Sequence, residues 1–196
     1  MNSKNLYIVA GCNGAGKTTA SFNILPEILD CKEFVNADEI AKGISPFNPE
    51  GVSIEAGRIM LDRIKELLKS NQNFAFETTL ASITFTNFIG KAKQQGYNVT
   101  LIFLWLENEE LAISRVFNRV KEGGHNIPES TIRRRYHSGI NNLFQKYWDL
   151  PDSILIYDTS TGIPDLICTK ALDEKPTIID SIKFNHLLVQ ANERHE

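Results

Sequence analysis

A glycine-rich segment near the N-terminus carries residue types that bind phosphate. Residues 11–18 read Gly-Cys-Asn-Gly-Ala-Gly-Lys-Thr and fit G-x-x-x-x-G-K-[ST], the phosphate-binding loop (P-loop). In this motif the backbone N–H groups surround the phosphates, Lys17 reaches the β- and γ-phosphates, and the Thr18 hydroxyl binds Mg²⁺. The sequence therefore predicts a site for a nucleoside triphosphate and Mg²⁺. The residues predicted to bind the nucleotide are Gly11, Asn13, Gly14, Ala15, Gly16, Lys17, Thr18 and Thr19.

Alternating strands and helices must position this loop. Apolar runs predict strands at residues 6–10, 33–36, 74–76, 98–106 and 153–157. Helical periodicity and breakers predict helices at residues 18–25, 53–70, 84–95, 109–120 and 128–147. A hairpin and a final helix are expected within about residues 165–196. This order predicts an open, mostly parallel α/β sheet.

The composition favours one cytoplasmic domain spanning residues 1–196. The chain has three cysteines, an odd number that lacks the spacing of a disulfide framework, and this is typical of a reducing compartment. The longest apolar run, residues 101–106, is too short to cross a membrane, and a strand from residue 6 leaves no room for a secretory signal. The net charge of −3 argues against non-specific binding to nucleic acid.

Polar residues follow several predicted strands, where ligands bind in parallel α/β sheets. Asp38 could accept the proton of an attacking hydroxyl, or could only cap the helix that follows. Glu77, Thr78 and Thr79 could bind a hydroxyl-bearing acceptor, or form an ordinary turn. Asp158 follows an apolar run as Mg²⁺-binding aspartates do, although an edge of the nucleotide pocket is the preferred interpretation.

A basic region surrounds the Gly123-Gly124 pair, within about residues 109–147. Its cations are Arg115, Arg119, Lys121, Arg133, Arg134 and Arg135. Arginine binds phosphate oxygens bidentately, and a helix–loop–helix lid could close over a nucleotide and exclude water. A solvated surface paired with nearby glutamates is the alternative. A helical wheel puts Arg133 nearest the apolar stripe and Arg134 opposite it, which leaves open which arginine contacts phosphate.

Four segments together resemble the zeta toxin family, over about residues 5–160. They are the loop Gly11–Thr18, Asn36-Ala37-Asp38, Phe76-Glu77-Thr78-Thr79, and Arg119 followed by Gly123-Gly124-His125 and Ile132-Arg133-Arg134-Arg135. The resemblance implies a three-layer α/β P-loop kinase fold with a helical lid. It also implies an enzyme that uses ATP and Mg²⁺ to phosphorylate a UDP-sugar such as UDP-N-acetylglucosamine, and an antitoxin protein as partner.

The resemblance also implies roles for individual residues. Lys17 and Thr18 would hold phosphate and metal, Asp38 would be the catalytic base, and Glu77 would help to bind the acceptor. Arg119 and one or more of Arg133, Arg134 and Arg135 would clamp the transferred phosphoryl group. We therefore predict an ATP-dependent kinase acting on a hydroxyl of a small acceptor. One alternative is a non-catalytic nucleotide-binding module or switch. Another is a kinase of nucleic-acid ends, which the net negative charge of the chain makes less favoured.

Overall fold

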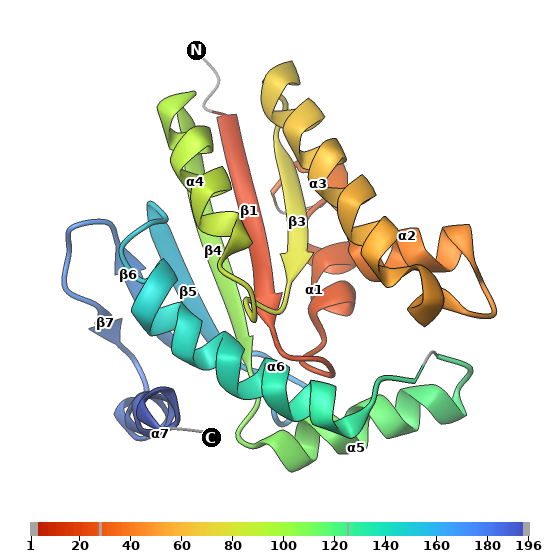
Figure 1. The fold of residues 1–196 in the computed structure, drawn as a ribbon. Helices are drawn as coiled ribbons and strands as arrows, with labels where there is room; N and C mark the ends of the chain where they lie inside the picture. Colours follow the sequence, from red (N-terminus) through yellow and green to blue (C-terminus); the bar gives the residue numbers. More distant parts are fainter. Residues whose placement is uncertain (1–3, 28, 125, 194–196) are drawn as a thin grey trace.

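The computed structural model describes residues 4–27, 29–124 and 126–193, and its strands form one sheet. The strands are β1 (Lys4–Gly11), β2 (Glu33–Val35), β3 (Phe74–Thr78), β4 (Tyr97–Trp105), β5 (Ser153–Asp158), β6 (Asp165–Ala171) and β7 (Thr177–Ile178). Their order is β2-β3-β1-β4-β5-β6-β7 (Figure 1). The first five are parallel, while β6 and β7 are antiparallel, which confirms the predicted open, mostly parallel sheet.

The helices cover both faces of this sheet, as the three-layer fold requires. They are α1 (Lys17–Ile24), α2 (Ala37–Ile44), a 3₁₀ turn (Pro49–Val52), α3 (Ser53–Ser70), α4 (Thr84–Gln94), α5 (Glu109–Lys121), α6 (Glu129–Asn142), a π-helical turn (Leu143–Tyr147) and α7 (Ser181–Asn192). In Figure 1, α3, α4 and α6 lie in front of the strands. His125, part of the quoted motif, lies outside the described residues, as do the ends of the predicted domain at 1–3 and 194–196.

Two apolar clusters fill the space between the sheet and the helices on its two faces. The larger cluster joins Leu6 and Phe74 of the strands to Ile64 of α3 and Ile89 of α4. The smaller cluster joins Leu25, Cys31 and Ala75, with Tyr7 packed against it. Successive side chains of a strand point to opposite faces, so Leu6 and Tyr7 place these clusters on the two sides of the sheet.

The central strands are buried on both faces. In β4 the five consecutive residues Leu101–Trp105 are all buried, and β4 pairs with β1 along the full length of β1. Such continuous apolar runs are typical of central parallel strands. The predicted site residues follow the carboxyl ends of β1, β3 and the edge strand β2, beside this buried centre of the sheet.

The C-terminal helix docks beside the carboxyl end of β4 through a buried amide. The indole Nε1 of Trp105 donates to Oε1 of Gln190 at 2.9 Å, and Nε2 of Gln190 donates to the Glu107 carbonyl at 2.8 Å. The Gln190 side chain therefore satisfies a donor and an acceptor that lie where β4 ends. Across the described ranges, no helix has the length and apolar character needed to span a membrane.

Replacing Gln190 with leucine tests this docking. Gln190→Leu keeps the side-chain size but leaves the buried indole N–H without its acceptor, so we expect the free energy of unfolding to fall by about 1–3 kcal/mol. Urea denaturation measures the change. The control Val189→Ala alters a neighbouring side chain that is 59% exposed, and should change stability by less than about 0.5 kcal/mol. Equal stabilities of Gln190→Leu and wild type would contradict this role.

Candidate active site

The loop after β1 has the backbone geometry that phosphate binding needs. Gly11 and Gly14 have φ values of +139° and +84°. A Cβ on Gly11 would lie 2.2 Å from the Leu104 carbonyl oxygen, so the contact with the neighbouring strand requires glycine there. Burial raises the pKa of the Cys12 thiol to about 11, so this thiol stays protonated at neutral pH.

The carboxylate of Glu77 connects the loop to the two neighbouring strand ends. It accepts hydrogen bonds from Oγ1 of Thr18 and from Nδ2 of Asn36, both at 2.9 Å. The Lys17 ammonium lies 3.5 Å from the same carboxylate and donates to the Cys12 carbonyl at 2.9 Å. Lys17 and Glu77 are nearly buried, with exposed side-chain fractions of 6% and 10%. Glu77 therefore lies directly against the residues predicted to bind phosphate and metal.

Asn36 was not among the predicted site residues, although it positions one of them, Asp38. Its Oδ1 accepts hydrogen bonds from the backbone N–H groups of Asp38 and Glu39, and thereby caps α2. The alternative in which Asp38 only caps this helix is therefore wrong, because Asn36 is the cap. The available signal for this role was an asparagine, a preferred N-cap residue, at the end of the predicted strand 33–36. Asp38 lies in the first turn of α2 and faces the cavities described next.

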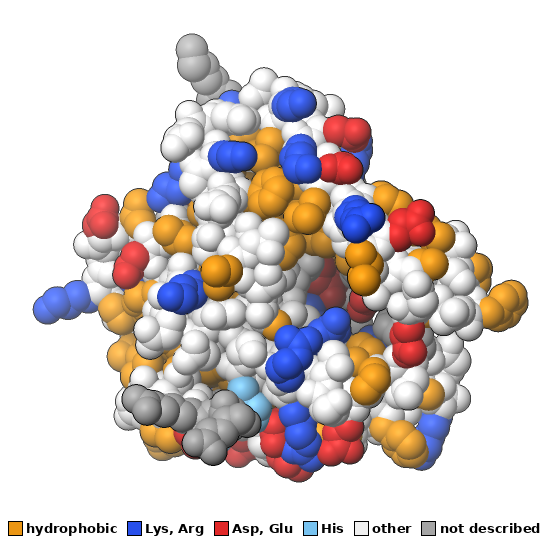
Figure 2. Space-filling model, viewed as in Figure 1, with side chains coloured by type: hydrophobic (Ala, Val, Ile, Leu, Met, Phe, Trp, Pro, Cys, Tyr) orange, Lys and Arg blue, Asp and Glu red, His pale blue; other side chains and the backbone are white. Residues whose placement is uncertain are grey.

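Two adjoining cavities meet at four residues. The first, here the loop cavity, has a volume of about 280 Å³ and includes Thr18, Thr19 and Arg119 in its lining. The second, here the outer cavity, has about 380 Å³ and includes Thr78 and Thr79. The residues that line both cavities are Asn13, Lys17, Asp38 and Glu77. Figure 2 shows a hollow in the front face with acidic atoms at its floor and basic atoms at its rim.

The arginines of α5 lie against the phosphate loop. Arg115 donates to the Gly14 carbonyl at 3.3 Å and to the Thr159 carbonyl at 2.8 Å, and so braces the loop against the segment after β5. Arg119 lines the loop cavity, and its Nε and Nη2 are buried without a hydrogen-bond partner in the described part of the chain. Buried donors are normally satisfied, so the Arg119 guanidinium fits an anion such as phosphate.

The arginines of α6 divide between two environments. Arg135 donates to Oδ1 of Asn13 at 3.2 Å and lines the outer cavity, as does the exposed Arg134. Burial lowers the pKa of Arg135, and the charge of nearby Asp38 acts in the opposite direction. Two of the three consecutive arginines therefore face the cavities.

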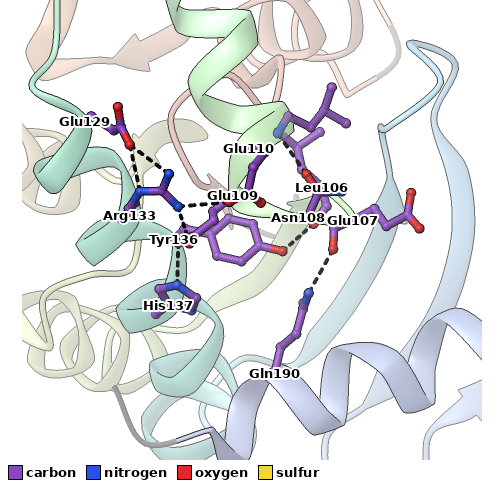
Figure 3. A network of polar contacts seen from close by, with 11 residues as sticks. Leu106, Glu107, Asn108, Glu109, Glu110, Glu129, Arg133, Tyr136, His137 and Gln190 are labelled. Atoms are coloured by element: carbon purple, nitrogen blue, oxygen red, sulfur yellow. Dashed lines mark hydrogen bonds and ion pairs between the residues drawn. The ribbon is translucent and has the colours of Figure 1, made fainter. Parts of the chain in front are cut away.

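Arg133 points elsewhere. It forms ion pairs with Glu129 at 2.7 Å, with Glu110 at 3.0 Å and with Glu109, as Figure 3 shows, and it lines neither cavity. These hydrogen bonds raise the pKa of Arg133. Among the arginines predicted to be catalytic, the structure brings Arg119 and Arg134 to the site and keeps Arg133 on the outer side of the α5–α6 pair.

The oxygen atoms at the loop fit Mg²⁺. Mg²⁺ typically keeps several waters and binds one or two carboxylates together with substrate phosphates. The Thr18 hydroxyl and the Glu77 carboxylate supply such oxygens next to the loop. A cluster of three or more His, Cys, Asp or Glu side chains, which Mg²⁺ does not need, is absent from the described residues. Asp158 has another role, because it pairs with Lys183 of α7 at 2.8 Å.

Sequence comparisons identify relatives of the chain. The family model described as zeta toxin matches residues 2–161. The chain is also 33% identical over 138 residues to an uncharacterized protein of Haemophilus influenzae, a match that covers 69% of this chain and 94% of that protein.

Solved structures share the fold. The PezAT toxin–antitoxin structure of Streptococcus pneumoniae matches with a TM-score of 0.68 at 16% identity, over 97% of this chain and 85% of that chain. A structure of AvrRxo1-ORF1:-ORF2 with ATP matches with a TM-score of 0.78 at 15% identity, over 99% of this chain and 66% of that chain. At such identities these likenesses show the fold alone. The family match and the P-loop support a kinase-like, nucleotide-binding function, and the chain belongs to the zeta toxin family.

Proposed function

We propose that this protein is an ATP-dependent kinase that transfers the γ-phosphoryl group to a hydroxyl of a small acceptor. The observation that carries the proposal is the meeting of the loop cavity and the outer cavity at Asn13, Lys17, Asp38 and Glu77. A phosphoryl group held by Lys17 would face an acceptor hydroxyl beside Asp38. A module that only binds nucleotide needs no second cavity at the phosphate end of its site.

The reaction needs positioning and positive charge more than covalent chemistry. Lys17 and the loop N–H groups would hold the phosphates, while Arg119 and Arg135 would stabilise the charge on the transferred group. Asp38 would accept the proton of the attacking hydroxyl. Thr18 and Glu77 would hold Mg²⁺, which when bound neutralises charge on the β- and γ-phosphate oxygens.

The lining of the outer cavity supports a hydroxyl-rich acceptor that also carries an anionic group. Thr78, Thr79 and Ser82 supply hydroxyls, Phe85 supplies an apolar wall, and Arg134 lies at the rim. A UDP-sugar such as UDP-N-acetylglucosamine has sugar hydroxyls and a diphosphate, and is our proposed acceptor. Incubation with labelled ATP and a panel of UDP-sugars, nucleosides and sugars tests this. ADP release that does not depend on any acceptor would favour the switch alternative.

We further propose a cytoplasmic protein with an antitoxin partner. The three thiols, Cys12, Cys31 and Cys168, are free, which suits a reducing compartment. The PezAT neighbour comes from a toxin–antitoxin system, and this supports the search for such a partner.

Within a single domain of residues 1–196, the α5–α6 region at 109–147 would act as the lid.

Removing the proposed base should separate transfer from binding. In Asp38→Asn the side chain keeps its shape but loses its proton affinity, so the transfer rate should fall by about 10²- to 10⁴-fold. The ATP affinity, measured with a fluorescent analogue, should change less than about threefold. Asp62→Asn is the matched control, because Asp62 is an exposed aspartate of α3 that pairs with Lys65. Transfer by Asp38→Asn at the wild-type rate would contradict the assignment.

The two environments of the α6 arginines allow a matched pair of variants. Arg135→Gln removes a cation from the meeting point of the cavities, so kcat should fall by about 10²- to 10³-fold. Arg133→Gln removes a cation that pairs with Glu109, Glu110 and Glu129 outside the cavities, and should leave kcat within about threefold. Steady-state kinetics of both variants checks this, with thermal unfolding alongside. A similar loss of kcat in the two variants would contradict the prediction that only the arginine lining the outer cavity contributes to transfer.

Glu77→Gln tests the proposed metal side of the site. The amide keeps an oxygen for hydrogen bonds from Thr18 or Asn36 but loses the negative charge that favours Mg²⁺. We expect the Mg²⁺ concentration for half-maximal ATP binding and for half-maximal transfer to rise about 10- to 100-fold. Titration of Mg²⁺ at fixed ATP measures both. An unchanged Mg²⁺ requirement would place the metal away from Glu77.

A further inference from the structure

The last residue of β3 and the four residues after it, here the acceptor loop (residues 78–82), form a wall of the outer cavity. The loop turns at Leu80, which is fully buried and has a φ of +55°, a conformation that L-residues other than asparagine and aspartate rarely adopt. Such a turn persists only where its surroundings hold it in place. Thus the acceptor loop depends on contacts from other elements.

The turn sets the hydrogen-bonding role of the two threonines. The backbone N–H of Leu80 donates to Oγ1 of Thr78 at 3.1 Å, and that of Ala81 donates to Oγ1 of Thr79 at 3.4 Å. A hydroxyl has one proton to donate besides its lone pairs. With a lone pair of each oxygen engaged by the backbone, both hydroxyls keep their proton for a ligand in the outer cavity.

Three contacts from α6 and the π-helical turn hold the acceptor loop. Nδ2 of Asn142 donates to the Leu80 carbonyl at 2.7 Å, and the Tyr147 hydroxyl donates to the Ser82 carbonyl, also at 2.7 Å. Gly139 packs so closely that a Cβ on it would lie 2.5 Å from the carbonyl oxygen of Thr79. Of these, the Asn142 bond acts directly on the residue with the left-handed conformation.

The same helix carries Arg134 and Arg135, which line the outer cavity two turns earlier. One helix therefore carries both the arginines of the outer cavity and the contacts that hold the acceptor loop. We infer that Asn142 is a positioning residue of the acceptor site, which holds Leu80 so that Thr78 and Thr79 remain hydrogen-bond donors. The preferred acceptor then presents an accepting oxygen close to its reacting hydroxyl. The inference rests on the proposed kinase function.

The neighbouring asparagine supplies a matched control. Asn141 also donates from Nδ2 to a backbone carbonyl, that of Ala191 in α7, at 3.0 Å. Asn142→Asp and Asn141→Asp each put a carboxylate of the same shape against a carbonyl. We expect Asn142→Asp to raise the KM for UDP-N-acetylglucosamine about tenfold with the KM for ATP unchanged, while Asn141→Asp leaves both unchanged. A purely structural role would lower the melting temperature without separating the two KM values.

Gly139→Ala perturbs the acceptor loop without a charge. Alanine favours the helix, yet its Cβ would displace the Thr79 carbonyl, so the variant should be folded and show the same selective rise in the acceptor KM. Equal KM values in Gly139→Ala, Asn142→Asp and wild type would overturn the inference.

Hydrogen–deuterium exchange follows the loop without any need for activity. Asn142→Asp should speed exchange at residues 79–83 and leave residues 11–18 as in wild type, whereas Asn141→Asp should change neither. Unchanged exchange at 79–83 in Asn142→Asp overturns the inference. Absence of transfer by the wild type to every acceptor overturns only the proposed function, and the dissociation constant of UDP-N-acetylglucosamine from calorimetry then replaces its KM in the comparison of variants.

Discussion

The site depends on one nearly buried carboxylate. Burial of a charge is costly unless partners compensate it, and Glu77 meets this requirement with Thr18, Asn36 and Lys17. Thr18 and Lys17 lie where the phosphate loop runs into α1, and Asn36 lies after the end of β2, so the carboxylate, which belongs to β3, fixes three segments relative to one another. Asn36 in turn caps α2 and so places Asp38. The proposed base is therefore held in position by the same charge that would hold the metal.

The sheet makes this convergence possible because β1 lies between β3 and β4. Val9 pairs with Glu77 and Gly11 pairs with Leu104, so the loop leaves the sheet between two strands that are already hydrogen-bonded to it. Buried parallel strands move little, and binding groups at their carboxyl ends inherit that rigidity. Helix α6 contacts the acceptor loop, which continues from the carboxyl end of β3, through Asn142.

Local patterns in the sequence predicted the strands, the phosphate loop and the final helix, because each depends on residues close in the chain. The predicted helix at 53–70 matches α3 in both bounds. Contacts between distant residues could not be predicted. Glu77 and Thr18 are 59 residues apart, and only the strand order brings them together. The helical wheel likewise could not say which of Arg133, Arg134 and Arg135 contacts phosphate, because the position of Arg133 depends on glutamates of α5.

The arginines of α5 and α6 divide into a group that pairs within the protein and a group suited to an anion. Arg133 is exposed enough for water to screen its ion pairs, so they orient α5 and α6 more than they stabilise them. Arg119 differs, because its buried Nε and Nη2 have no partner among the described residues. Leaving such donors unsatisfied costs about 1–3 kcal/mol, and a phosphate bound beside Arg119 would recover part of that cost. Binding at the loop and stability of the α5–α6 pair are therefore linked, since a ligand that binds only the folded chain stabilises it.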